Sequence, residues 1–349
     1  MKLRFLVGCY TSLIEESSLH ILELNQTSKT LTLVNSHQVS NPSFSAFFPA
    51  KSIIYTVNEN HGLNDRLTAV AFDREKLLFK TINEVDIKAS DPCFISVDSK
   101  GKHVFSANYS DGTLSCVALN IDGSLGNLVQ VIKHEIDPLD EAHPNTHMHA
   151  AVLSPDEQFL LVSNLGQDTI TIYNYQASEE KPLTGTGHVY RFQDGTGPRH
   201  LIFDAAAKFV YVVGELDGSL HVLAWAEGTL TAVQRLMLMP PDFKDKNSAA
   251  DLHFGASGDF LYVSNRGDAN QIISFSIDQV TGKATVLDRT ASLGEGPRNF
   301  AIDPSGKYML VAHQYSNNIR LFEIDPLNGK LCDTGKSVQL NSPVYVSFL

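Results

Sequence analysis

Residues 296–313 have the sequence GPRNFAIDPSGKYMLVAH, and this stretch determines how the rest of the chain is interpreted. A Gly-Pro pair opens it and a short apolar run follows. A turn-forming segment at residues 303–307 separates that run from a second one rich in Met, Leu and Val. Apolar β-forming runs on both sides of a turn that contains Pro and Gly are typical of a β-hairpin. The stretch therefore predicts two antiparallel strands.

The same hairpin pattern occurs six times, and a fragment of it closes the chain. Successive copies begin 46 to 56 residues apart. The segments between copies have room for two more strands, separated by turns such as Asp122-Gly123 and Asn328-Gly329. A period near 50 with four strands per copy is the signature of a propeller blade. The copies open at Pro42, Pro92, Met148, Pro198, Ala249, Pro297 and Pro343.

The two ends of the chain complement each other. Residues 343–349 form a first strand with no second strand after it, and residues 1–11 form a second strand with no first strand before it. Residues 19–24 and 31–36 supply an outer pair, so joining the ends makes a seventh blade and closes the ring. The sequence thus predicts an all-β chain in which residues 1–349 form one domain, a seven-bladed β-propeller with four antiparallel strands per blade. Residues 1–10 are interpreted as a strand rather than as a targeting segment.

Composition narrows the function classes. The net charge is −12, which disfavours nucleic acid or an anionic membrane as a partner, because both require a basic face. No apolar run approaches the length of a membrane span. The four cysteines are scattered without a CxxC pair, which indicates thiols in a reducing compartment, and we expect the cytoplasm. The oligomeric state is not determined by the sequence.

The phase of the repeat predicts which side chains share one mouth of the ring. When the opening residue of each copy is numbered 0, the turn lies near +8 to +10, so positions +1 and +17 meet at the open end of the hairpin. The +1 residues are Ser43, Cys93, His149, Arg199, Ala250, Arg298 and Val344, and the +17 residues are Glu59, Tyr109, Leu165, Glu215, Arg266 and Gln314.

The residue types at this mouth suit the handling of a small anion. Arginine binds carboxylate or phosphate through a forked set of donors, and a cluster of arginines requires an acid or a bound anion to offset it. In ester or lactone hydrolysis a base activates water and an arginine stabilises the oxyanion, and both Glu215 and His149 are candidates for that base. We predict His149, Arg199, Glu215 and Arg266 as catalytic residues, and Arg298, His147, His253, Glu59 and Asp251 as substrate-binding residues.

Plainer interpretations of some of these residues stay open. Glu59, Tyr109 and Gln314 are also suited to capping strands or binding water in the channel. Arg298 is equally suited to a structural ion pair.

A metal site is a further alternative at this mouth. His147 and His149, with His143 and Asp137, are residue types that bind metals, and alternate residues of a strand share a face. Such groups arise often by chance in a chain with 13 histidines. We therefore expect a site without a metal or an organic cofactor.

Motifs spread over six blades resemble the lactonase, seven-bladed β-propeller family, which includes propeller-type 6-phosphogluconolactonases and carboxy-muconate lactonising enzymes. The resemblance covers nearly the whole chain and implies an active site made of His149, Arg199, Glu215 and Arg266. The chain departs from the usual hairpin turn at residues 49–51 and 204–207, at the mouth opposite the predicted site. The motifs are Val7–Thr11, Asn41–Ser43, His149 with Ser154–Asp156, Gly197–His200, Glu215, Ala250–His253, Ser264–Gly267 and Gly296–Phe300.

Three functions follow as expectations. The resemblance implies a lactonase that hydrolyses a small anionic sugar lactone, with 6-phosphogluconolactone as the expected substrate and 6-phosphogluconate as the product. A muconate-type lactonising enzyme would use the same mouth for ring closure and would need no activated water. A non-catalytic propeller would bind a protein or a small acid at a mouth or blade edge without turnover.

Overall fold

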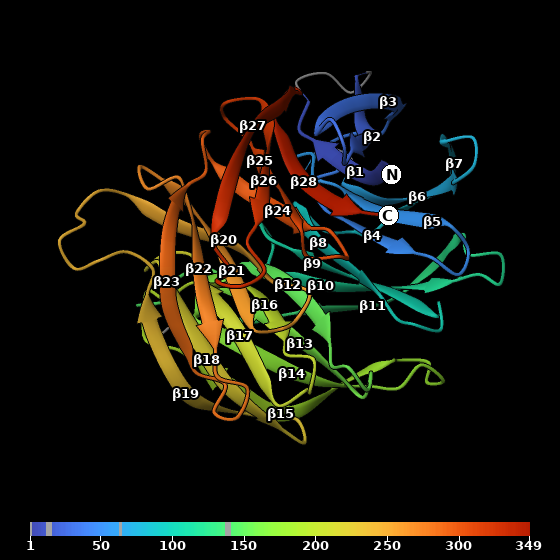
Figure 1. Cartoon of the computed structure of the whole chain (residues 1–349). Coiled ribbons are helices and arrows are strands. Elements are labelled where there is room, and N and C mark those ends of the chain that lie inside the picture. Colours follow the sequence, from blue (N-terminus) through green and yellow to red (C-terminus); the bar gives the residue numbers. More distant parts are fainter. Residues whose placement is uncertain (1, 12–15, 63–64, 137–140) are drawn as a thin grey trace.

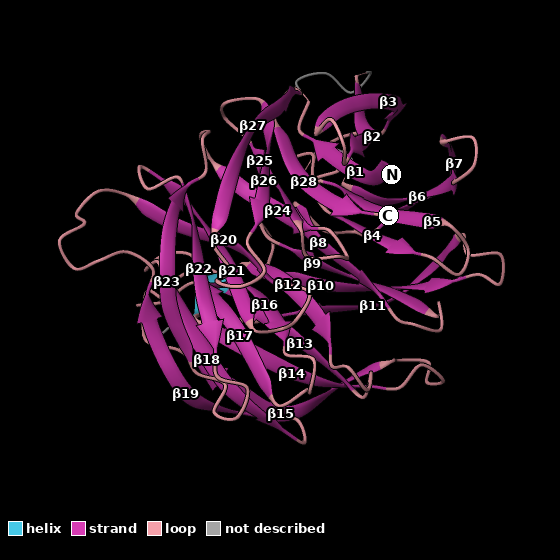
Figure 2. Cartoon of the chain, in the orientation of Figure 1, coloured by secondary structure: helices cyan, strands magenta, loops and turns pink. Residues whose placement is uncertain are grey.

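The chain folds as a ring of seven four-stranded antiparallel sheets, as the sequence predicts (Figure 1). The computed structural model describes residues 2–11, 16–62, 65–136 and 141–349. Almost all regular structure in this part of the chain is β-strand, and the helical exception is a single 3-10 turn, η1 (Leu165–Gln167) (Figure 2). No helix in these residues has the length and apolar character needed to cross a membrane.

Each blade places its first strand nearest the ring axis. The blades are β28 (Pro343–Phe348) with β1 (Lys2–Cys9), β2 (Ser17–Asn25) and β3 (Thr30–Gln38); β4 (Ser45–Phe48), β5 (Ile53–Asn58), β6 (Arg66–Asp73) and β7 (Leu78–Asp86); β8 (Pro92–Val97), β9 (His103–Asn108), β10 (Thr113–Leu119) and β11 (Leu125–Lys133); β12 (Met148–Leu153), β13 (Phe159–Asn164), β14 (Thr169–Tyr175) and β15 (Leu183–Arg191); β16 (Pro198–Phe203), β17 (Phe209–Gly214), β18 (Ser219–Ala226) and β19 (Thr229–Met237); β20 (Asn247–Phe254), β21 (Phe260–Gly267), β22 (Gln271–Ile277) and β23 (Ala284–Ala291); and β24 (Pro297–Ile302), β25 (Tyr308–His313), β26 (Asn318–Ile324) and β27 (Leu331–Gln339).

The hairpin β24–β25 shows why the repeat folds as it does. The carboxylate of Asp303 accepts hydrogen bonds from the backbone N–H groups of Lys307 and Tyr308, at 2.8 and 2.6 Å, and so closes the turn. Gly306 adopts a left-handed backbone with φ of 72°, which glycine allows without strain. Asp98 and Asp204 close two other turns in the same way.

Two first strands differ from the predicted boundaries. β4 begins at Ser45 rather than at Pro42, because the N–H of Ser43 turns back to the carbonyl of Asn41 at 2.8 Å. β20 begins two residues before Ala249, because its partner β21 continues to Gly267.

The ring is closed by pairing of the two ends of the chain. β28 pairs with β1 in antiparallel register from Phe5 opposite Phe348 to Cys9 opposite Pro343. The labels for the two termini lie close together in Figure 1, where the red β28 runs beside the blue β1. The first ten residues therefore contain the predicted strand, Lys2–Cys9.

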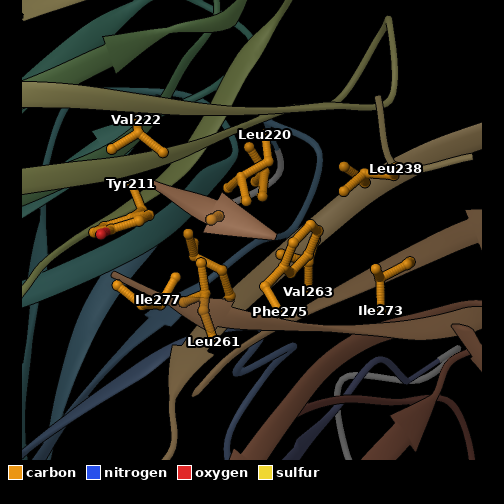
Figure 3. Close-up of a cluster of buried hydrophobic side chains, with 13 residues drawn as sticks. Tyr211, Leu220, Val222, Leu238, Leu261, Val263, Ile273, Phe275 and Ile277 are labelled. Atoms are coloured by element: carbon orange, nitrogen blue, oxygen red, sulfur yellow. The ribbon is translucent and has the colours of Figure 1, made fainter. Parts of the chain in front are cut away.

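Neighbouring blades are held together by apolar side chains between their sheets. Figure 3 shows one such cluster, in which Tyr211 and Val222 of one blade pack with Leu261 and Phe275 of the next. Full burial of a side chain of this size contributes about 1.5–3 kcal/mol. The hydroxyl of Tyr211 also donates to the carbonyl of Gly282 at 2.6 Å, which ties one blade to the outer turn of the next.

Candidate active site

A bulge in the first strands directs the +1 residues toward the ring axis. In β8, β12 and β24 the pairing skips one residue, which is Cys93, His149 and Arg298 respectively. β16 also carries one extra residue relative to its partner β17, in the stretch that contains Arg199, and β20 carries one relative to β21, in the stretch that contains Ala250. A bulge interrupts the alternation of side chains and re-aims the extra residue. The +1 side chains therefore leave the face that strand periodicity alone would assign to them.

The +17 residues are fixed at the same mouth by their own backbone. In six blades the N–H of the +17 residue donates to the carbonyl of the residue that precedes the opening position, at 2.8 to 3.1 Å. This bond clamps the end of the second strand to the start of the first and so fixes where the side chain begins. The six donors are Glu59, Tyr109, Leu165, Glu215, Gln314 and, in the blade that the two ends of the chain complete, Tyr10.

These two sets of residues line one cavity of about 460 Å³ at the mouth of the ring. A cavity of this volume falls in the range that holds small-molecule ligands. Eight of its ten lining residues come from the +1 and +17 positions, and the other two are His61 and Ser342. The eight are Tyr10, Glu59, Cys93, Tyr109, His149, Glu215, Arg298 and Gln314.

Glu215 is the centre of an ion triplet with Arg199 and Arg266. Its Oε2 lies 2.8 Å from Nε of Arg199, and its Oε1 lies 2.8 Å from NH2 of Arg266. Arg199 is only 1% exposed, and its NH1 also donates to the carbonyl of Ala250. Arg266 donates to the hydroxyl of Ser248 at 2.8 Å. Glu215 reaches the cavity, whereas the two arginines support it from behind.

The electrostatics of this wall fix the charge states of its groups. Burial raises the pKa of Glu215, but Arg266 and Arg199 overcome that effect and hold the pKa below its ordinary value. Burial lowers the pKa of Arg199 to about 10, so the guanidinium stays charged near neutral pH. Burial, with Arg199 and His200 nearby, lowers the pKa of His149 well below its ordinary value. His149 is therefore a neutral imidazole beside a charged triplet.

A second polar group forms another part of the cavity lining. The hydroxyl of Tyr10 donates to Oε2 of Glu59 at 2.7 Å and accepts a hydrogen bond from NH2 of Arg298 at 3.2 Å. The guanidinium of Arg298 also lies over the Tyr10 ring, 5.6 Å from its centroid. Burial raises the pKa of Tyr10 far above its ordinary value, so the phenol keeps its proton. Glu59 and Arg298 are therefore connected through hydrogen bonds to one hydroxyl, that of Tyr10.

The nine predicted site residues differ in whether they line the cavity, contact a lining residue or lie behind it. Glu59, His149, Glu215 and Arg298 line the cavity, and Arg199 and Arg266 contact Glu215. His147 stacks on Tyr109, with ring centroids 4.3 Å apart, and so supports a lining residue.

Asp251 and His253 are not among the residues that line the cavity. The carboxylate of Asp251 is 3% exposed and contacts Nδ1 of His200 at 2.8 Å, Nε2 of His253 at 2.9 Å and Nδ2 of Asn299 at 2.5 Å. His200 in turn lies 3.2 Å from NH1 of Arg199. The two predicted binding residues thus belong to a polar network centred on the buried Asp251, with the half-exposed His253 at its edge, and this network contacts the ion triplet through His200.

One group in the described part of the chain has the spacing of metal ligands, and it consists of His143, Asp168 and Asp194. The two oxygens of Asp168 already accept hydrogen bonds from the N–H groups of Gly197 and Gly195, both at 2.6 Å. His147 and His149 do not belong to this group, and Asp137 lies outside the described residues.

Tyr10 is a cavity-lining residue that the repeat phase missed. It follows the last residue of β1 as Tyr109 follows β9, and its N–H bonds the carbonyl of Ser342 at 3.0 Å. It is therefore the +17 residue of the blade that is split between the two ends of the chain. Numbering the copies around the closed ring, rather than along the chain, identifies it.

Comparison with known proteins defines the class. The family described as lactonase, seven-bladed β-propeller, matches residues 4–348, and the chain belongs to this family. Among its relatives are 6-phosphogluconolactonases of Formosa agariphila, 30% identical with 93% of each chain covered, and of Bacillus subtilis, 28% identical with 98% of this chain and 97% of the relative covered. A solved periplasmic gluconolactonase of Pseudomonas aeruginosa, PpgL, is 33% identical with a TM-score of 0.95, covering 100% of this chain and 99% of that one.

Proposed function

We propose that this protein hydrolyses a sugar lactone, with 6-phosphogluconolactone as its substrate and 6-phosphogluconate as its product. The observation that carries the proposal is the cavity in which Glu215 of the ion triplet, the neutral His149 and Arg298 meet. The names of the Formosa and Bacillus relatives supply the substrate.

The charge at the cavity wall favours an anionic substrate. Two guanidinium groups share the single carboxylate of Glu215, so the ion triplet carries a net positive charge. Arg298 adds a further cation that makes no direct ion pair within the described residues. Phosphate and carboxylate groups are the ligands that guanidinium groups bind best.

The same contacts divide the roles of the predicted catalytic residues. Both oxygens of Glu215 lie 2.8 Å from an arginine, so Glu215 is a poor proton acceptor and orients Arg199 and Arg266. The Nδ1 of the neutral His149 ring lies 3.8 Å from the Cys93 thiol, so Nε2 is the ring nitrogen left for a ligand, and it donates when it carries the proton. We assign it to the lactone carbonyl, where a neutral donor stabilises the developing oxyanion.

An unphosphorylated gluconolactone is the second candidate substrate. The Pseudomonas relative is named as a gluconolactonase. Arg298 is the one Arg or Lys among the described residues that line the cavity, whereas a phosphate dianion is usually held by several cations.

A pH-stat assay with both lactones tests the proposal. We expect acid release from 6-phosphogluconolactone well above the spontaneous rate, and a higher kcat/KM than for gluconolactone. A higher kcat/KM for gluconolactone would instead support the second candidate. Acid release from both lactones at the rate of the protein-free blank would refute the hydrolase and leave the binding-module or lactonising alternatives.

We also propose the cytoplasm as the compartment. All four cysteines are free thiols, and three of them are buried, which is consistent with a reducing environment. Fractionation of the native host should recover the protein with cytoplasmic markers, and recovery with periplasmic markers would contradict this.

A further inference from the structure

Two carboxylates reach the cavity, and they differ in how many of their oxygens are engaged. Both oxygens of Glu215 lie against arginines. Oε2 of Glu59 accepts a hydrogen bond from Tyr10, and no contact from a described residue is found at its Oε1. A general base needs a lone pair that a water molecule can reach. Glu59 has one oxygen with no hydrogen bond from a described residue, whereas each oxygen of Glu215 already faces a cationic donor.

Tyr10 fixes the position of Glu59. The phenol donates to Glu59 and accepts from Arg298, so the direction of its hydroxyl hydrogen is determined by two partners. The backbone of Glu59 is clamped as well, because its N–H bonds the carbonyl of Asn41 at 3.1 Å. Glu59 is also 8% exposed, which limits the water that competes for its carboxylate. These restraints orient a base in advance of the reaction.

Arg298 lies on the other side of the same hydroxyl. Among the described residues its guanidinium donates one hydrogen bond, to the Tyr10 hydroxyl, so further N–H groups remain for a ligand. In lactone hydrolysis the attacking water and the carbonyl oxygen flank one carbon atom. A carboxylate and a guanidinium that share one bridging hydroxyl are spaced for these two roles.

On the basis of the proposed lactone hydrolysis, we infer that Glu59 is the catalytic base, that Tyr10 positions it, and that Arg298 joins His149 in stabilising the oxyanion. The water oxygen bonds to the carbonyl carbon while Glu59 takes one water proton and the carbonyl electron pair moves to oxygen. The intermediate then breaks its bond to the ring oxygen, which takes the proton back from Glu59. The product is the hydroxy acid, which ionises in solvent, and Glu59 is restored.

The test compares Glu59→Gln with the wild-type enzyme in the pH-stat assay. We expect kcat to fall about 100-fold or more, as for loss of a general base, with KM changed less than about threefold. The fall of wild-type kcat/KM at acid pH should be absent from Glu59→Gln. Glu84→Gln, at an exposed ion pair with Arg66, is the matched control and should keep wild-type kinetics.

Tyr10→Phe supplies the second readout. It should lower kcat about tenfold, with KM changed less than about threefold, because the Glu59 carboxylate loses the hydrogen bond that holds it in place. An active wild type with Glu59→Gln within about threefold of its kcat would overturn the inference. So would an acid limb that persists in Glu59→Gln and is lost in His149→Gln. A wild type no faster than the blank would instead remove the proposed function itself.

Discussion

Replacement of Glu215 by glutamine removes the carboxylate that two buried guanidinium groups share. The side chains of Arg199 and Arg266 are 2% and 11% exposed, so neither charge regains full hydration in the variant. Breaking a buried ion pair costs about 3–5 kcal/mol. Since the side chain of Glu215 is itself 21% exposed, we expect the lower end, about 3 kcal/mol.

Glu84→Gln is the matched control for this stability measurement. The Glu84–Arg66 contact is shorter, at 2.6 Å, but the side chains are 44% and 36% exposed. Exposed pairs of this type contribute less than about 1 kcal/mol. The two variants therefore separate the effect of burial from the effect of removing one carboxylate near an arginine.

Urea denaturation followed by tryptophan fluorescence gives both numbers. Trp225 is the only tryptophan, and it packs edge-on against Phe159 and Phe203 in the outer part of the blades. Added sulfate should recover more stability in Glu215→Gln than in the wild type, because it can replace the missing anion. A loss below about 1 kcal/mol, or one equal to that of Glu84→Gln, would show that Glu215 does not hold the two arginines.

Three further predictions use the same preparations. Tyr211→Phe should lower the free energy of unfolding by about 1 kcal/mol, because the carbonyl of Gly282 loses its donor, and an unchanged urea midpoint would contradict this. In the native protein a thiol reagent should modify Cys332 readily, and Cys9 and Cys116 only after denaturation. Fast labelling of Cys9 or Cys116 would show that the apolar clusters between the blades open. The free energy of unfolding should be highest above about pH 6.5 and should fall as the pH is lowered toward 4. Burial lowers the pKa of five histidines to about 4 in the folded protein, so the unfolded chain binds more protons than the folded one between about pH 6.5 and pH 4. A constant urea midpoint across this range would refute the prediction. The five are His20, His134, His200, His221 and His313.

Most of the fold was predictable because each hairpin carries local signals. The turn at Asp303 and Gly306 and the apolar runs beside it mark both strands of that copy, and β25 ends at His313 as the pattern predicts. β4 escaped this reasoning because the backbone at Asn41 and Ser43 forms a local turn, which no apolar pattern reveals.

The site was predictable only as far as the repeat phase reaches. Phase placed His149 and Glu215 at one mouth, but it gave no information on the bulges that rotate Arg199 toward Glu215. Asp251 followed the same logic yet entered a buried network, because the bulge in β20 changes which side chains face the axis. Tyr10 was missed because its blade is completed only when the chain closes on itself.

The most direct test of the account is the catalysed rate of 6-phosphogluconolactone hydrolysis in Arg266→Gln and in Arg320→Gln. Both substitutions remove an arginine that pairs with a carboxylate, Glu215 in the cavity wall and Asp333 at the surface. We expect a loss of about 100-fold for Arg266→Gln, because Glu215 then loses a restraint on its position in the cavity wall and misplacement of a site by about 1 Å costs on this scale, and the wild-type rate for Arg320→Gln. Equal rates in the two variants, after subtraction of spontaneous hydrolysis, would contradict the assignment of lactone hydrolysis to this cavity.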